Sequence, residues 1–186
     1  VVVALVAACV FWLIGKYNAM VTAEENVTTA WSQVENQYQR RSDLIPNLVA
    51  TVKGYAEHES SVFENVTEAR ARATQLTLSE NATPEQMMAF QQAQGELTQA
   101  LGRLLALAEN YPDLKANENF RDLQAQLEGT ENRIAVARNA FNEAAKAYNI
   151  LIRKFPNNIV AGIFGFGQKA YFEADEGADK VPVVEF

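Results

Sequence analysis

Very few side chains in this sequence have the type and spacing that catalysis or metal binding requires. His58 is the only histidine and Cys9 the only cysteine, so the chain offers no Ser/His/Asp or Cys/His set and too few ligands for zinc. A di-iron bundle needs Glu-x-x-His pairs on different helices, and residue 55 is Tyr. Glu128 and Glu131 lie one helical turn apart and could reach a common ion, but most such pairs are solvated. We therefore assign no catalytic, cofactor-binding or metal-binding residues and no cofactor.

A few polar residues stand where apolar ones are expected. Arg41 and Glu59 fall on an otherwise apolar helical stripe, where a polar residue can fix register or oligomeric state. Hydrogen-bonding residues also cluster at 117–120 and at 128–132, the second around Gly129. These clusters are interpreted as a helix cap followed by a tolerated glycine, with a specific subunit contact as the alternative.

Composition limits the function classes. At 186 residues and 48% hydrophobic, the chain can form one domain with a core, plus one anchor. A net charge of -7 and a pI near 4.8 argue against nucleic acid as a partner, because phosphate binding requires clustered Lys and Arg. The acidic balance also argues against adhesion of the domain surface to anionic lipid. Membrane attachment is therefore expected from the N-terminus.

The N-terminal segment has the pattern of a membrane anchor. An apolar run covers residues 1–14 and is followed by Lys16 and Tyr17, which with Trp12 suit a bilayer boundary. A spanning helix needs about 20 apolar residues. We therefore predict that residues 1–15 are a transmembrane helix truncated at its N-terminus. Lys16 slightly favours a cytoplasmic domain, but the side of the membrane is not predicted.

Cys9 raises an alternative for this segment. Residues 6–9, Val-Ala-Ala-Cys, look like the box that precedes the acylated cysteine of bacterial lipoproteins. The apolar run continues to Ile14, where a mature lipoprotein would become polar. The favoured interpretation of Cys9 is a small hydrophobic residue within a spanning helix.

A long helix is expected to follow the anchor directly. From Val27, alternating steps of four and three residues reach mostly apolar positions as far as Leu76, a spacing that a helix produces and a strand does not. The pattern predicts a helix over residues 17–77. Pro46 interrupts it without a change of phase, so a kink is favoured over a break capped by Ser42 or Asp43.

Two further helices are predicted, over residues 84–111 and 117–155. The first begins with Thr83-Pro84-Glu85-Gln86, a capping box with proline at the first helical position, and ends at Pro112. The second ends at Pro156. The fold class is all-α: an N-terminal transmembrane helix that continues into an antiparallel bundle of long helices over residues 16–156.

The last part of the chain, residues 157–186, is expected to be an apolar and acidic C-terminal tail rich in Gly and aromatic residues. Its apolar residues must fold back on the bundle or contact a neighbouring subunit, since they would otherwise form a large exposed patch. With a continuous first helix, three helices alternate in direction and residues 159–166 lie far from the membrane. We favour that arrangement. With a reversal near Pro46, four helices alternate, and Phe164 and Phe166 lie at the bilayer interface.

Several long segments resemble the LemA family of bacterial membrane proteins. They comprise the anchor and the sequences Gln39-Arg40-Arg41-Ser42-Asp43-Leu44-Ile45-Pro46-Asn47-Leu48-Val49, Tyr111-Pro112-Asp113-Leu114-Lys115-Ala116-Asn117-Glu118-Asn119-Phe120, Leu127-Glu128-Gly129-Thr130-Glu131-Asn132-Arg133-Ile134 and Phe155-Pro156-Asn157-Asn158. The resemblance covers essentially the whole chain. It implies a single-pass protein of the bacterial inner membrane with a helical-bundle domain, and it supplies no catalytic residues.

The sequence therefore predicts a membrane-anchored, non-enzymatic helical scaffold whose coiled-coil-like stripes and apolar tail pack laterally into a homo-oligomer. The alternative is an adaptor that presents its bundle or tail to another membrane protein, such as a protease or a transporter. The expected partners are membrane lipid through the N-terminal helix, further copies of the chain and other membrane proteins. An enzyme with an unrecognised site is disfavoured, because no acid, base and nucleophile set is present.

Overall fold

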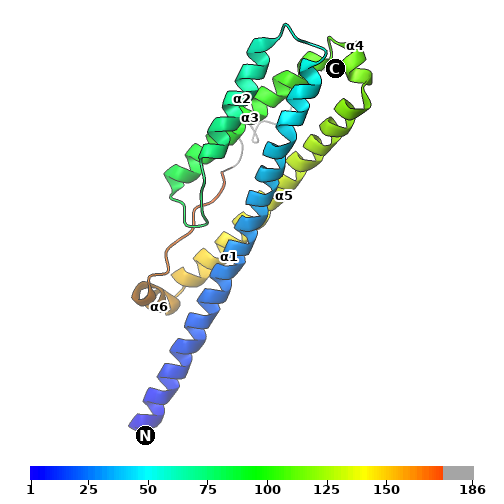
Figure 1. Cartoon of the computed structure of the whole chain (residues 1–186). Coiled ribbons are helices and arrows are strands. Elements are labelled where there is room, and N and C mark those ends of the chain that lie inside the picture. Colours follow the sequence, from blue (N-terminus) through cyan, green and yellow to red (C-terminus); the bar gives the residue numbers. More distant parts are fainter. Residues whose placement is uncertain (174–186) are drawn as a thin grey trace, which may run out of the picture.

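The computed structural model describes residues 1–173, which form six helices and no strand (Figure 1). The helices are α1 (Val2–Lys53), α2 (Ser60–Gln75), α3 (Pro84–Ala108), α4 (Pro112–Ala116), α5 (Glu118–Arg153) and α6 (Asn157–Phe164). Helix α1 packs mainly against α5, and α2 packs mainly against α3. The predicted all-α bundle is confirmed. The acidic part of the expected tail beyond Glu173 lies outside the described residues.

Helix α1 joins the apolar N-terminal segment to the bundle without interruption. It has 52 residues, so it is about 78 Å long. An 18-residue window of it has a mean hydropathy of 1.7 and is not buried, so by length and composition this helix could cross a membrane. The apolar segment and the bundle therefore share one helical rod.

Pro46 neither breaks α1 nor starts a new helix. A proline has no N–H, so the carbonyl of residue 42, four positions earlier, loses its usual helical donor. Nε of Arg70 on α2 donates a hydrogen bond to the carbonyl oxygen of Ser42 at 2.9 Å. The contact with α2 thus replaces the donor that Pro46 lacks, and this explains why the alternative break at Ser42 or Asp43 does not occur.

The predicted helix over residues 17–77 is wrong beyond Lys53. Residues 54–59 form a turn, and the chain reverses into α2. Tyr55 is 43% exposed and Glu59 is the N-cap of α2, so neither residue lies on a helical seam. Ala56 is buried and closes the end of the core. The turn happens to preserve the four-three spacing, so the apolar pattern alone could not reveal the reversal.

Local signals placed the starts of α3 and α5 well. The N–H of Gln86 donates to Oγ1 of Thr83 at 3.2 Å, and the N–H of Thr83 donates to Oε1 of Gln86 at 2.9 Å, which is the predicted capping box. Oδ1 of Asn117 accepts a hydrogen bond from the N–H of Phe120 at 3.0 Å and caps α5. Helix α3 ends at Ala108, and Pro112 begins α4.

The extra reversal also overturns the predicted position of the tail. Four long helical segments alternate in direction, so α5 returns toward the N-terminal end of α1 and α6 lies beside it (Figure 1). The ring centroid of Phe164 lies 4.9 Å from that of Tyr17, the residue that follows the apolar run. Residues 159–166 are therefore near the expected membrane boundary. The arrangement that placed them far from the membrane is wrong.

The bundle contains two apolar cores. The distal core, farther from the N-terminus, joins α1 to α2, α3, α4 and α5. The proximal core joins α1, α3 and α5 to α6 and to the chain that follows it. The principal residues of the distal core are Ile45, Leu48, Val52, Phe63, Val66, Leu97, Leu104, Phe120 and Leu127, and those of the proximal core are Met20, Val27, Trp31, Phe90, Phe141, Tyr148, Ile152, Val160 and Phe172.

Candidate functional site

The most specific polar contacts of the molecule hold the chain that follows α6. We call residues 165–173 the C-terminal segment. It leaves α6 at Gly165, whose φ of 78° is in the left-handed region that glycine tolerates. The segment then runs back along the bundle toward α3 (Figure 1). It is neither helix nor strand, so its backbone needs partners outside regular secondary structure.

Three side-chain amides supply those partners. Asn142 and Asn149 are seven residues apart on one face of α5, and Gln91 lies on α3. Each of the three amides both donates to and accepts from the backbone of one residue. Asn149 pairs with Lys169 at 2.9 and 2.8 Å, Asn142 pairs with Phe172 at 2.8 and 2.8 Å, and Gln91 pairs with Glu173 at 3.1 and 3.0 Å. The amides therefore replace the missing backbone ladder.

Phe172 anchors the segment in the proximal core. Its side chain is 4% exposed and stacks on the indole of Trp31, with ring centroids 5.9 Å apart and an interplanar angle of 12°. Phe141 meets it edge-on at 5.5 Å, and the guanidinium of Arg138 lies 5.1 Å from its centroid. Such aromatic contacts add stability beyond the burial of area.

Lys169 ties the segment to the other side of the bundle. Its residue exposure is only 5%, and Nζ donates to Oε1 of Glu24 on α1 at 2.8 Å and to Oδ1 of Asn81, in the α2–α3 connection. Nζ also lies 5.3 Å from the ring centroid of Tyr148. A buried ammonium is stable only when it is paired and hydrogen-bonded. Lys169 therefore fixes the segment relative to three parts of the chain.

Tyr148 lies beneath Lys169 in an unusual environment. Its residue exposure is 0%, and its hydroxyl has no hydrogen-bond partner among the described residues. Burial raises the pKa of Tyr148 to about 12, and the negative charge of Glu24 adds to the rise. The phenol is therefore neutral at ordinary pH and acts as an apolar wall with a polar tip.

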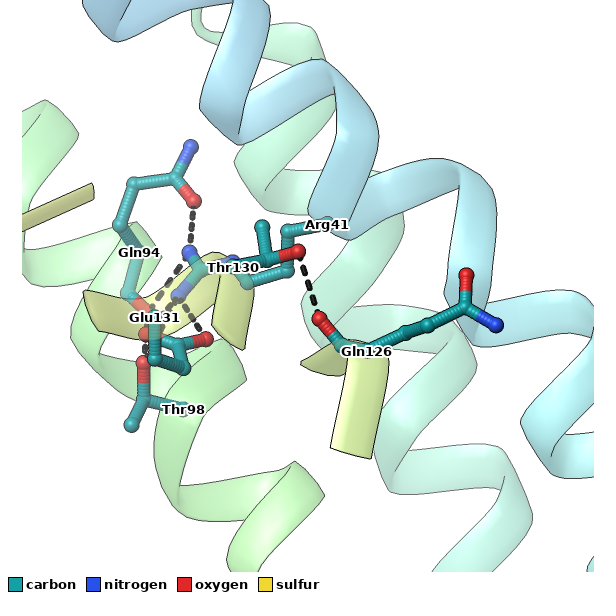
Figure 2. A network of polar contacts seen from close by, with 6 residues as sticks. All are labelled: Arg41, Gln94, Thr98, Gln126, Thr130 and Glu131. Atoms are coloured by element: carbon teal, nitrogen blue, oxygen red, sulfur yellow. Dashed lines mark hydrogen bonds and ion pairs between the residues drawn. The ribbon is translucent and has the colours of Figure 1, made fainter. Parts of the chain in front are cut away.

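A second polar cluster lies deeper in the bundle, around Arg41 (Figure 2). Arg41 is 2% exposed. Its Nη1 donates to Oγ1 of Thr98 at 2.9 Å and to Glu131, whose oxygens lie at 3.0 and 3.3 Å. Its Nη2 donates to the side-chain and backbone oxygens of Gln94. We call Arg41, Gln94, Thr98 and Glu131 the polar layer.

The polar layer separates the two apolar cores. On α1, Arg41 lies between Val34 of the proximal core and Ile45 of the distal core. On α3, Gln94 lies between Phe90 and Leu97 in the same way. Nε2 of Gln94 also donates to the carbonyl oxygen of Ala73 on α2 at 3.3 Å. The layer thus connects four helices and fixes their register, a role for which buried polar residues are well suited.

The structure places the residues singled out in the sequence in different environments. Arg41 occupies the core as a register-setting residue, and Glu131 is its ion-pair partner. Glu128 accepts a hydrogen bond from Gln124 at 3.0 Å, so it does not share a site with Glu131. His58 is exposed in the α1–α2 turn. Cys9 is exposed on α1.

Metal ligands and cavities are few in the part of the chain that the structure describes. Residues 1–173 contain no group of three or more His, Cys, Asp or Glu side chains that could hold a metal ion. A cavity of about 140 Å³ lies between α1, α3 and the end of α2, with Trp31, Tyr38 and Gln94 in its wall. A second hollow, of about 310 Å³, is lined by Asn142, Lys146 and Tyr171 and is more open to solvent. Pockets for drug-sized ligands are about 300–1,000 Å³ and bury most of the ligand.

Sequence reasoning missed the amides that hold the C-terminal segment. Asn142, Asn149 and Gln91 bind backbone atoms, and backbone atoms leave no complementary pattern in the sequence. One signal was available: Asn149 directly follows Tyr148 on the apolar stripe of α5, and it is 3% exposed. A buried amide needs partners, so its position predicts a nearby polar group without identifying it.

Comparisons with known proteins identify the family of this chain. The model of the LemA family matches residues 30–186, which include the polar layer and the C-terminal segment. The chain belongs to the LemA family. Magnetosome proteins MamQ 1 and MamQ 2 of Paramagnetospirillum magneticum are each 31% identical to it over 197 aligned residues, which cover 96% of this chain and 72% of theirs. Protein LemA of Metamycoplasma hominis is 22% identical over 166 residues, which cover 89% of this chain and 73% of that protein.

Proposed function

We propose that this LemA-family chain is a non-enzymatic scaffold that is anchored in the bacterial inner membrane by one pass of α1 and assembles laterally with copies of itself. The continuity of α1 supports the proposed membrane anchor. Because the apolar segment and the bundle are one helix, the position of the span determines the position of the bundle. The names of the MamQ relatives state a cellular structure and no reaction, which agrees with a structural role.

The observation that carries lateral assembly is a row of exposed positions on α5 in which apolar residues lie on either side of Glu143. The inner face of α5 is buried in both cores, whereas Val136 and Ile150 on the opposite face are 69% and 44% exposed. Between these two residues, exposed positions recur at alternating steps of four and three residues. The full row is Val136, Ala140, Glu143, Ala147 and Ile150. This is the spacing of a helix seam, and the alanines allow close approach of another helix.

Light scattering of the detergent-solubilised chain tests the proposal. We expect an oligomer whose mass falls toward the monomer on dilution. The double substitution Val136→Glu with Ile150→Glu should shift the mass to monomer, because two carboxylates would have to be desolvated at the seam. The control Ala135→Glu with Arg153→Gln changes the net charge equally at other exposed positions of α5, and its oligomer should persist.

A monomeric wild-type chain at all concentrations in mild detergent would overturn lateral assembly and leave the adaptor as the remaining function. An oligomer that survives the seam substitutions would move the interface away from α5. The predicted role of the apolar tail in assembly is tested in the same experiment by Ile163→Glu, at a position of α6 that is 69% exposed. This substitution should weaken the oligomer if that part of the chain contacts a neighbour.

A further inference from the structure

Helix α6 presents large apolar side chains to solvent on the side that faces away from the bundle. Val160 and Ala161 pack into the proximal core, as expected for one face of a docked helix. The outward residues are also apolar, and their exposed fractions are 82% for Phe155, 54% for Ile159, 69% for Ile163 and 54% for Phe164. We call these four residues the α6 face. In water such a cluster is unfavourable, so it indicates a contact.

The position of α6 identifies that contact. Phe164 and Phe166 lie against Tyr17, at ring-centroid distances of 4.9 and 5.7 Å. Tyr17 lies three residues beyond the apolar run 1–14 of α1, the helix that could cross a membrane, and Lys16 beside it lies over the ring of Trp12 at 5.8 Å. Aromatic and basic residues at this point of a spanning helix mark the headgroup region. Helix α6 is therefore level with that region.

The charge distribution supports the same partner. The chain has 23 acidic residues, yet none lies within residues 1–23 or 144–172, which contain the apolar run of α1, the end of α5 and α6. Basic residues do occur there, and Arg153 and Lys154 are exposed beside Phe155. An acidic protein thus has one end that is apolar and basic, the combination that favours anionic lipid.

We propose that the α6 face is a second membrane contact, which inserts into the headgroup region of a bilayer and favours anionic lipid through Arg153 and Lys154. This inference rests on the proposed membrane span of α1. With two contacts, the bundle is held at a fixed tilt and cannot swing freely about the end of the span. The inner face of α6, with Val160 and Ala161, remains in the proximal core. Insertion of the outer face therefore requires no unfolding.

Spin labels on the intact 186-residue chain in vesicles test this contact. In a Cys9→Ala background, single labels are placed at Ile163 in the α6 face, at Val6 in the span and at Lys53 at the distal end. The vesicles contain phosphatidylcholine with phosphatidylglycerol. Accessibility to oxygen, which concentrates in lipid, is compared with accessibility to a water-soluble nickel chelate. We expect the oxygen-to-nickel ratio at Ile163 to be several times that at Lys53 and closer to that at Val6.

The outcomes separate the inference from the proposed function. A label at Val6 that behaves like Lys53 would overturn the span. If the span is normal but the label at Ile163 is as accessible to nickel as the label at Lys53, the lipid contact alone is overturned. Protection of Ile163 from both oxygen and nickel would also overturn it, because such protection indicates a protein neighbour. In phosphatidylcholine alone we expect a lower ratio at Ile163. Arg153→Gln with Lys154→Gln should abolish that dependence, and a dependence that survives would refute the role of the two basic residues.

Discussion

The two cores of this bundle are closed in different ways. Four long helices and the short α4 surround the distal core, and its α2 and α3 follow one another in sequence. In the proximal core the place of α2 is taken by the C-terminal segment, which is extended and enters from the far end of the chain. A helix satisfies its own backbone hydrogen bonds, whereas an extended segment must find partners for them. The side-chain amides of α3 and α5 are the consequence of that difference.

This comparison predicts different modes of opening. The distal core opens only if helices separate or unfold, because each of its walls is a helix. The proximal core can open by release of the C-terminal segment while α1, α3 and α5 remain helical. Local openings of this kind require less free energy than global unfolding. The polar layer lies between the two regions, so it limits how far such an opening extends along the bundle.

The largest expected effect comes from breaking the polar layer. Glu131→Gln leaves the guanidinium of Arg41 buried with neutral acceptors only, which should lower the free energy of unfolding by about 3 kcal/mol. The lower end of the usual range applies because the Glu131 side chain is 35% exposed. Unfolding of the detergent-solubilised chain in guanidinium chloride, followed by circular dichroism, measures the change.

Glu128→Gln is the matched control for that substitution. It removes the same charge one helical turn away, from a side chain whose partner is Gln124. The change should stay within about 0.5 kcal/mol, as for an ordinary surface site. Equal losses in the two variants would show that the polar layer does not depend on the charge of Glu131.

A smaller effect, confined to the proximal region, is expected from Asn149→Asp. The amide nitrogen donates to the carbonyl of Lys169 and to the hydroxyl of Tyr171. A carboxylate cannot donate to a carbonyl, so the docked segment should be destabilised by about 2 kcal/mol. The loss cannot exceed the free energy of docking, because the segment can detach.

Tryptic cleavage after Lys169 measures this detachment. The side chain of Lys169 is buried in the native chain, so cleavage there requires release of the segment. When opening is fast relative to cleavage, about 2 kcal/mol corresponds to cleavage roughly 30 times faster. Asn139→Asp, at an exposed position of α5, is the control and should cleave at the wild-type rate. Equal rates for Asn149→Asp and wild type would exclude Asn149 as a major contributor to docking.

Helix starts were predictable from the sequence in both regions. Thr83 caps α3 at its proximal end and Asn117 caps α5 at its distal end. Arg41, between the two cores, was conspicuous because it interrupts an apolar stripe. Local capping and helical period are written in neighbouring residues. The α1–α2 turn escaped notice because Tyr55 and Glu59 keep the helical spacing by coincidence, and the missing reversal then inverted the predicted position of α6.

The proximal region was predicted only in outline. The sequence indicated that apolar residues of the tail must be covered, and Phe172 is indeed buried against Trp31. The contacts that position it join residues far apart in sequence and use backbone atoms, as Asn142 does with Phe172. Neither periodicity nor composition records such pairings, so they require the three-dimensional structure.

The smallest effect sharpens the comparison by changing one buried hydroxyl of the proximal core. In wild type the raised pKa of Tyr148 means that the folded state favours the neutral phenol. This contribution to stability is complete below pH 10, the ordinary tyrosine value, and is lost as the pH rises toward 12.

Tyr148→Phe removes the group that titrates. At neutral pH the variant should differ from wild type by less than about 1 kcal/mol, because the hydroxyl has no partner to lose. From pH 10 upward the variant should become progressively more stable relative to wild type. Chemical unfolding of both chains across this range measures the difference, and a difference that does not change with pH would show that Tyr148 ionises as easily in the folded chain as in the unfolded one.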